Sequence, residues 1–407
     1  MSRLSYEELN RIKEQHKTDR IWSWSRLECF RTSPYEYLLK YILKKQGDKC
    51  DSCYTTLGSC CHTALEKFYG GQITYEEMIN DFDDSYLTAI IIAGLRFNRT
   101  DDEKDKSIGM KYNENLRHFF QNHVVYKQKL ALEVPIVIDI DNNVFVGYAD
   151  AVFRDEEGCF HIIDFKSSSI YSGKTLEEHS GQLTLYALGL HQKGVPLDKI
   201  KIAFNFLKYC TITYPQKNGK IKETNCERSK IGEKLQASAK TWLKACGYDE
   251  NTINEHLKLM LDTNSIAYLP EEVKSKYTIT DCHVYVDDLE SLVEKWTDVI
   301  QSTIKDIRLR EADYERTKSD KCFWDTDESV KAQSYYFANL CDYSPNLHLP
   351  YKEYLEKLEL AKGVSVFDSV GNDVDSVEPT LNNVSDSKVI SQKKDEVDLS
   401  WLNDLEL

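Results

Sequence analysis

Hydrophobic side chains in the first 130 residues recur every three or four positions, which is the spacing of amphipathic helices. Ser25 is a residue type that caps a helix, and Pro34 suits a first helical turn. The period sets the remaining boundaries. It predicts helices over residues 5–17, 25–30, 35–45 and 57–69, and mostly helical structure over 75–128.

A different pattern begins at Glu133, where short runs of alternating or continuous hydrophobic residues replace the helical period. Turn-forming residues at 141–143 and 155–158 divide these runs. The second turn is short enough to close a hairpin. The runs predict strands over 133–140, 144–154 and 159–166.

The second half of the chain uses both patterns. Thr175 and Glu178 form a capping box, which predicts a helix from about Leu176 to Gln192. Further predicted elements are strands over 200–214, from 220 and over 277–286, a helical insertion over about 227–276 and a helix over 289–316. Together they predict one α/β body with helical additions: a leader helix in 1–20, a main domain over 21–345 and a C-terminal helix over 346–363.

Composition places the chain among globular proteins. Of 407 residues 41% are hydrophobic, and the longest aliphatic run, Ala89–Ala93, is far shorter than the roughly 20 residues of a membrane span. The first residues, Met1–Ser5, form no apolar segment, so we expect no export. Twelve cysteines without such a segment indicate a reducing compartment. We therefore expect the cytoplasm of a bacterial or phage-infected cell.

The net charge of −15 argues against a nucleic-acid partner only if it is spread evenly. Residues 364–407 contain ten acids and three lysines, and we interpret them as a disordered tail. Trp401, Leu402 and Leu405 lie there at helical spacing, as in a peptide that docks on a replication or recombination protein; a frayed acidic end is the alternative.

Lysines cluster between positions 199 and 222, where the sequence has no acid. Such a stretch suits a phosphate backbone, although a solvated strand face has the same composition. The candidate DNA-binding residues are Lys199, Lys201, Lys208, Lys217, Lys220 and Lys222.

Two carboxylates and a lysine converge in the predicted hairpin. Asp150 ends one strand, and Asp164 and Lys166 share one face of the next because side chains alternate along a strand. Two carboxylates can hold Mg²⁺ or Mn²⁺, which activates water, and an ammonium group can neutralise charge on phosphoryl oxygens. A surface ion pair would show the same short motif.

Other residues accompany this group. Gln182 and Tyr186 lie four residues apart on a predicted helix, as do His62 and Glu66. With Ser23-x-x-Arg-Leu27, Gly58-x-x-x-His62, Gly147-x-x-Asp150, Asp164-x-Lys166 and Gln182-x-x-x-Tyr186 in this order, residues 21–345 resemble the RecB-type branch of the PD-(D/E)XK nuclease superfamily. AddAB nuclease domains and CRISPR adaptation exonucleases belong to the same branch.

The resemblance implies a fold and a set of roles. The fold is α/β, with a restriction-endonuclease-like core in which helices flank a mixed central sheet. His62, Asp150, Asp164 and the main-chain carbonyl of Phe165 would bind the divalent metal. Lys166 would be the catalytic lysine, and Gln182 and Tyr186 would position the DNA backbone or the lysine. Glu133 matches a frequent family acid.

The cysteines raise two further metal hypotheses. Many relatives bind an iron–sulfur cluster through four cysteines, but Ser33 precedes Pro34 here and Ser334 lies where a middle ligand would fall. With only Cys29, Cys322 and Cys341 as candidates, we expect no cluster. A zinc site at Cys50, Cys53 and either Cys60 or Cys61 is the second hypothesis.

We interpret the chain as a Mg²⁺- or Mn²⁺-dependent DNase, an exonuclease on DNA ends or single strands, with water as the nucleophile. One rival is a non-catalytic nucleic-acid-binding or recruitment protein with the same fold. Another is a nuclease that works only inside a helicase assembly, whose motor would be a different chain because this sequence has no helicase phosphate loop.

Overall fold

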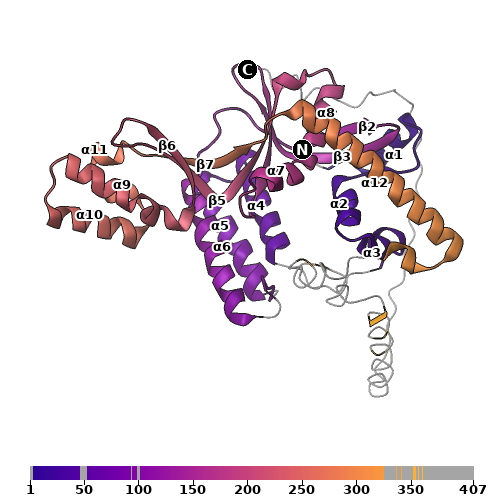
Figure 1. Ribbon diagram of the computed structural model, residues 1–407, viewed down its shortest axis with the longest axis horizontal. Coiled ribbons are helices and arrows are strands. Elements are labelled where there is room, and N and C mark those ends of the chain that lie inside the picture. The colour runs from indigo at the N-terminus through magenta and orange to yellow at the C-terminus, as the bar shows by residue number, and fades with distance from the viewer. Residues whose placement is uncertain are drawn as a thin grey trace.

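A mixed sheet runs through the part of the chain that the computed structural model describes, which is residues 3–45, 53–92, 94–98, 101–324 and positions 336, 341, 352, 353, 356 and 360. In that part, seven strands pair in the order β1-β3-β4-β5-β6, with β2 beside β3 and β7 beside β5 (Figure 1). The strands are β1 (Ile21–Trp22), β2 (Ala131–Ile140), β3 (Asn143–Arg154), β4 (Phe160–Lys166), β5 (Ile200–Pro215), β6 (Ile221–Glu227) and β7 (Thr278–Tyr285).

The helices surround this sheet. They are α1 (Tyr6–Gln15), α2 (Trp24–Thr32), α3 (Pro34–Tyr37), α4 (Cys53–Tyr69), α5 (Tyr75–Leu87), α6 (Asp102–Asn122), α7 (Gly173–His179), α8 (Gly181–Gln192), α9 (Ile231–Ala245), α10 (Glu250–Thr263), α11 (Glu271–Lys274) and α12 (Leu289–Thr317). Short π-helical turns lie at Leu38–Ile42 and Thr88–Ile92, and 3-10 turns at Leu197–Lys199, Arg228–Lys230, Ile266–Tyr268 and Asp320–Phe323.

Strand direction explains how the sheet places its chemistry. β3 is antiparallel to β2 and β4, whereas β4 and β5 run parallel with Phe165 opposite Asn205. The parallel connection passes through α7 and α8, as a crossover helix must. The middle of β3, which carries Asp150, and the C-terminal end of β4, which carries Asp164, therefore meet between the helical layers.

Two hydrophobic cores cover the two faces of the sheet. One contains Phe145, Ile162 and Phe204 with side chains of α2, α3, α8 and α12, and the other contains Phe153, Ile163 and side chains of α4, α5 and α6. Alternate residues of β4, such as Ile162 and Ile163, thus belong to different cores, as expected for a strand buried on both faces.

A separate lobe extends from the far end of β5 (Figure 1, left). There α9, α10 and α11 pack on the β5–β6 hairpin and on β7, around a third core that includes Ile212, Leu235 and Leu257. None of the helices in the described part of the chain is long and apolar enough to cross a membrane.

Two predicted helix boundaries are wrong. Ser23 rather than Ser25 caps α2, because its hydroxyl accepts the amide hydrogen of Arg26 at 3.2 Å. The helix predicted over 176–192 is two helices, and α7 begins before the expected cap at Thr175. They part at Ser180, whose hydroxyl donates to the carbonyl of Glu177 (2.8 Å).

The predicted acidic tail with Trp401, and Cys50 of the predicted zinc site, lie outside the described residues. So does most of the predicted helix over 346–363, where four single positions, 352, 353, 356 and 360, are helical.

Candidate active site

A cavity of about 670 Å³ lies between α4 and the end of β4. His62, Glu66, Glu133 and Lys166 line it, together with the serines at 167–169. Burial, and then the charge of Glu133, raise the pKa of Glu66. The charge of Glu133 thus disfavours the ionisation of Glu66, and such crowding of acids is the condition in which a cation is attracted.

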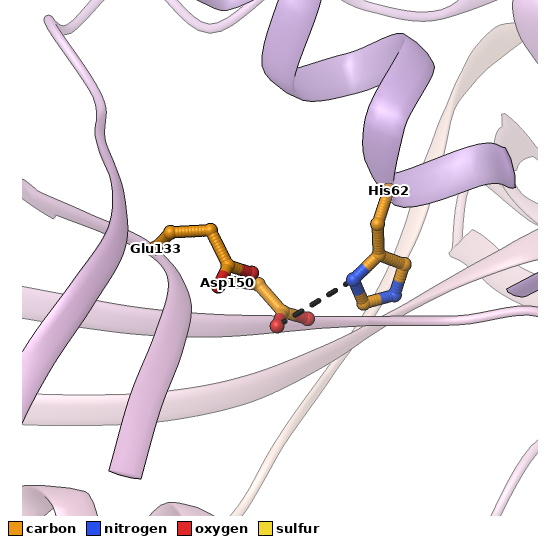
Figure 2. Close-up of side chains that lie close together, drawn as sticks. All are labelled: His62, Glu133 and Asp150. Carbon is orange, nitrogen blue, oxygen red and sulfur yellow. Dashed lines mark ion pairs between the residues drawn. The ribbon is translucent and has the colours of Figure 1, made fainter. Parts of the chain in front are cut away.

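Helix α4 brings His62 to the strands. Its Nε2 lies 2.9 Å from the main-chain oxygen of Phe165, to which it donates, and its Nδ1 lies 3.6 Å from Oδ1 of Asp150. Figure 2 shows His62 descending from the helix toward Asp150 and Glu133 on the strands below. The imidazole therefore joins α4 to both β3 and β4.

Asp150 and Asp164 lie opposite each other, one step beyond the β3–β4 pair Ala151–Ile163. Oδ2 of Asp150 accepts the amide hydrogen of Phe165 at 2.8 Å, so that carboxylate is fixed by β4. Burial, followed by the charge of Asp164, raises the pKa of Asp150 to about 7. Without a cation, the two carboxylates are poorly tolerated together at neutral pH.

Lys166 supplies one positive charge beside them. Its Nζ lies 2.6 Å from Oδ2 of Asp164, and its side chain is 30% exposed. Burial lowers the pKa of Lys166, but the charges of Asp164 and Asp150 outweigh that effect and hold the pKa above its ordinary value. Lys166 is therefore protonated at neutral pH, a state in which a lysine can act as a donor or counter-charge but not as a base.

Glu133 joins the group through an irregular backbone. Leu132 and Val134 pack into cores on opposite faces of the sheet, although residues two apart in a regular strand share a face. The strand turns at Glu133, whose φ of 47° lies in the left-handed region. Such strain in a residue other than glycine is concentrated at functional sites.

Side-chain atoms of His62, Glu133 and Asp150 lie within 4.8 Å of one another and can contact one metal ion. The carbonyl of Phe165, which the resemblance implied as a further ligand, lies on the other side of the His62 ring, where it accepts the Nε2 hydrogen. Two carboxylates with a single imidazole are a donor set for Mg²⁺ or Mn²⁺ rather than for a thiophilic metal. The sequence indicated Glu133 only through the resemblance, because its strained backbone leaves no trace in the pattern.

Gln182 and Tyr186 lie behind the carboxylates on α8. Gln182 Nε2 donates to the hydroxyl of Tyr186 at 2.9 Å, and Tyr186 is only 4% exposed. A Cβ at Gly147 would lie 2.2 Å from the Tyr186 ring, so glycine is required for this close approach. The glycine of Gly-x-x-Asp and the tyrosine of Gln-x-x-x-Tyr thus pack together beneath β3.

The six candidate DNA-binding lysines do not form one patch. Lys199 lies just before β5, and Lys201 lies at its start, where it pairs with Asp155 at 3.3 Å. Lys208 is buried in the wall of a second, smaller cavity. The exposed hairpin between β5 and β6 carries the others, Lys217, Lys220 and Lys222.

Two of the cysteines near the site are packed among hydrophobic side chains. Cys53 and Cys61 are fully buried in the core between α4, α5 and α6, and burial raises the pKa of Cys53 to about 12. Cys60 is partly exposed, and burial raises its pKa too. Raised thiol pKa values disfavour the thiolate that zinc requires.

Comparisons with known proteins add one informative match. Residues 21–325 match the family model described as the PD-(D/E)XK nuclease superfamily, which is more than half of the chain. No curated protein matches. A solved structure titled "Crystal structure of SSO0001" shares 16% identity over 57% of this chain and 85% of that chain, with a TM-score of 0.16, at which a likeness carries no argument.

Proposed function

This chain belongs to the PD-(D/E)XK nuclease superfamily, and from that membership we propose that it hydrolyses DNA from ends or in single strands. The membership confirms the predicted α/β fold with a mixed sheet and implies a metal-dependent nuclease. DNA as the substrate, exonuclease action and the RecB-type branch are our proposal. His62 on a helix before the carboxylate strands supports that branch.

One observation carries the proposal: His62, Asp150 and the Phe165 carbonyl meet beside the Asp164–Lys166 ion pair in an acid-lined cavity. A bound Mg²⁺ or Mn²⁺ would polarise the phosphodiester and lower the pKa of the attacking water. Lys166, protonated and 30% exposed, would neutralise charge on the phosphoryl oxygens. Asp150, fixed by the amide of Phe165, would hold its ligand oxygens in place.

The test uses linear DNA labelled at the 5′ or the 3′ end, single- or double-stranded, with Mn²⁺, Mg²⁺ or EDTA. We expect metal-dependent release of short products, slowed by about 10³-fold in Asp164→Asn and Lys166→Met, because the lost charge stabilisation is worth several kcal/mol. Lys276→Met is the control, since Lys276 packs on Trp242 in the α9–α11 lobe. Unchanged cleavage in both site variants contradicts the site assignment.

The same assay separates the rivals. A non-catalytic nucleic-acid-binding protein retains DNA affinity but releases no product with either metal. A nuclease that needs a helicase partner is inactive alone and becomes active only with that second chain. Labelled RNA of the same sequence tests the preference for DNA, because a 2′-hydroxyl is the group that distinguishes the two substrates.

We also propose that the protein works without an iron–sulfur cluster. The hydroxyl of Ser33, which precedes Pro34, accepts the amide hydrogen of Glu36 at 3.2 Å, so this side chain caps α3. Iron analysis of protein purified without oxygen tests this proposal. Four iron atoms per chain would overturn it.

Two further parts of the proposal concern cell biology. We propose that the acidic tail around Trp401 binds a replication or recombination protein, and that the enzyme acts in the cytoplasm. Pull-down from lysate with the full chain and with a Trp401→Ala variant tests the first part. Equal recovery of partners by both chains contradicts it.

A further inference from the structure

A second, smaller cavity lies beside the candidate active site. It measures about 170 Å³, and Tyr112 and Ser169 line both cavities. Lys208, Tyr209 and Glu227 also line it, as do Ile108 and Asn115, and the exposed Lys111 lies at its edge. Cavities for drug-sized ligands measure about 300–1,000 Å³, so this one suits a single chemical group of a larger substrate.

Lys208 is the distinctive residue of this cavity. It is only 9% exposed, and its Nζ lies 3.8 Å from the centre of the Tyr112 ring. Burial lowers the pKa of Lys208 to about 8, against the opposing charge of Glu227. Glu227 is already engaged by Lys230 at 3.0 Å. A buried ammonium group is unfavourable for folding, and a phosphate is the kind of ligand that would compensate it.

An irregularity in β5 turns Lys208 toward α6. Asn205 pairs with His283 of β7, and the next pair is Cys210 with Asp281, so four residues of β5 lie opposite one residue of β7. A bulge of this kind redirects side chains and is frequent beside active sites. On the other side of β5, the pairing with β4 ends at Lys166 and Phe206. Lys208 thus lies two residues after Phe206, the residue of β5 that pairs with Lys166.

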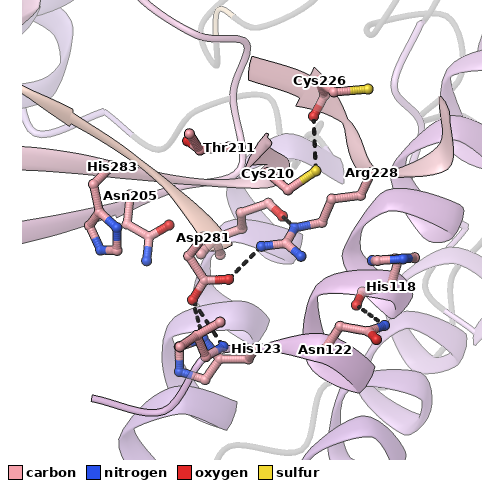
Figure 3. Close-up of polar contacts among 12 residues, drawn as sticks. His118, Asn122, His123, Asn205, Cys210, Thr211, Cys226, Arg228, Asp281 and His283 are labelled. Carbon is pink, nitrogen blue, oxygen red and sulfur yellow. Dashed lines mark hydrogen bonds and ion pairs between the residues drawn. The ribbon is translucent and has the colours of Figure 1, made fainter. Parts of the chain in front are cut away.

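A buried polar network holds this bulge in place. Nε of Arg228 donates to the carbonyl of Leu207 at 3.0 Å, and its guanidinium also pairs with Asp281 at 2.5 Å. His123 at the end of α6 lies 2.6 Å from the other oxygen of Asp281 (Figure 3). The side chains of His123, Arg228 and Asp281 are at most 2% exposed. The backbone next to Lys208 is therefore held by Arg228, which is itself held by Asp281.

We propose that Lys208, with Lys111 at the edge, binds a phosphate group of the nucleic-acid substrate next to the phosphodiester held in the active site. This inference rests on the proposed function. The phosphate is either the terminal one of a DNA end or the neighbouring internucleotide one. Lys208 is a positioning residue: it does not touch the reacting atoms, and the Arg228–Asp281 pair sets its direction.

Equilibrium binding in EDTA tests this without cleavage. The probe is a short fluorescein-labelled single-stranded oligonucleotide with a 5′-phosphate, a 3′-phosphate or hydroxyl ends. We expect Lys208→Met to weaken binding about tenfold to hundredfold, the usual effect of losing a hydrogen bond to a charged group. Lys276→Met, which also removes a lysine stacked on an aromatic ring, should bind like the wild type. Equal affinities of Lys208→Met and the wild type overturn the proposal.

The ends of the probe identify the phosphate. A loss confined to one phosphorylated end assigns the terminal phosphate, and an equal loss for all probes assigns the internucleotide phosphate. If Lys208→Met does not fold, Lys111→Ala decides, because Lys111 is exposed and its removal leaves the core intact. A loss of about twofold to fivefold supports the subsite, as exposed charges contribute about 0.2–1 kcal/mol, and no loss overturns it.

Cleavage kinetics separate this inference from the proposed function. With Mn²⁺, Lys208→Met should raise KM and leave kcat close to that of the wild type, whereas Lys166→Met lowers kcat. If the wild type binds DNA through Lys208 but cleaves nothing, the proposed function fails and the subsite stands. If it cleaves and Lys208→Met has an unchanged KM, the subsite fails and the proposed function stands.

Discussion

The molecule contains two clusters of similar composition that lie on either side of β5. The site cluster, His62, Glu133, Asp150, Asp164 and Lys166, lines or adjoins an open cavity. The network cluster, His123, Arg228 and Asp281, is almost fully buried. Both contain histidine and aspartate (Figures 2 and 3), and each adds a basic residue, Lys166 or Arg228. Composition alone does not distinguish them.

The balance of charge around the aspartate distinguishes the two clusters. Burial would raise the pKa of Asp281, but the hydrogen bond and charge of His123, and the charge of Arg228, hold it below its ordinary value. In Asp150 burial and the charge of Asp164 prevail over His62 and Lys166, and the pKa rises to about 7. A carboxylate with its cations present stabilises a fold, and one without them marks a place where a cation can bind.

The largest expected effect separates the clusters by stability. Asp281→Asn should lower the free energy of unfolding by about 3–5 kcal/mol, because it leaves the buried Arg228 without its counter-charge. Asp150→Asn in EDTA should not lower the free energy of unfolding, since the substitution removes a buried carboxylate whose charge is not balanced by nearby cations. Urea unfolding followed by circular dichroism at neutral pH measures both. Comparable losses in the two variants would show that the clusters do not differ in this way.

Sequence reasoning predicted the scaffold of the site well. The hairpin predicted between the strands 144–154 and 159–166 set Asp150 beside Asp164, and the structure pairs Ala151 with Ile163 next to them. These predictions succeed because strand period and hairpin turns are local properties. The family match over 21–325 confirms the fold that the motifs implied.

Features that depend on distant contacts could not be predicted. The left-handed backbone of Glu133, the bulge that turns Lys208 and the break at Ser180 arise from packing between elements. A cluster of lysines in sequence spreads along a strand of sixteen residues, from Lys199 just before β5 to Lys222 after it. The six lysines are therefore close together in the sequence but are not gathered on one patch of the surface.

Metal binding gives the next largest effect. Mn²⁺ at a hundred times its dissociation constant should raise the free energy of unfolding of the wild type by about 2.7 kcal/mol, the value for a ligand that binds only the folded state. Asp150→Asn should lose this gain, and Glu133→Gln should reduce it if Glu133 supplies a ligand oxygen. Calorimetric titration provides the dissociation constants, and urea unfolding the stabilities. An undiminished gain in Asp150→Asn would contradict the proposed ligand set.

The last effect, which is the smallest when taken per pH unit, tests the same contrast through pH. Because the pKa of Asp150 in the folded protein, about 7, exceeds its value of about 3.9 in an unfolded chain, the folded state binds more protons between those limits. In EDTA, Asp150 should therefore lower stability as pH rises from about 4 to 7, by at most about 1.4 kcal/mol per pH unit. The contribution of Asp281 to the pH dependence of stability has the opposite sign. Its lowered pKa contributes stability that is lost only as pH falls below about 4. Urea unfolding of the wild type and Asp150→Asn across this range should show the variant gaining relative stability toward pH 7. A constant difference would mean that the Asp150 carboxylate is already compensated without metal, and the two clusters would then be alike.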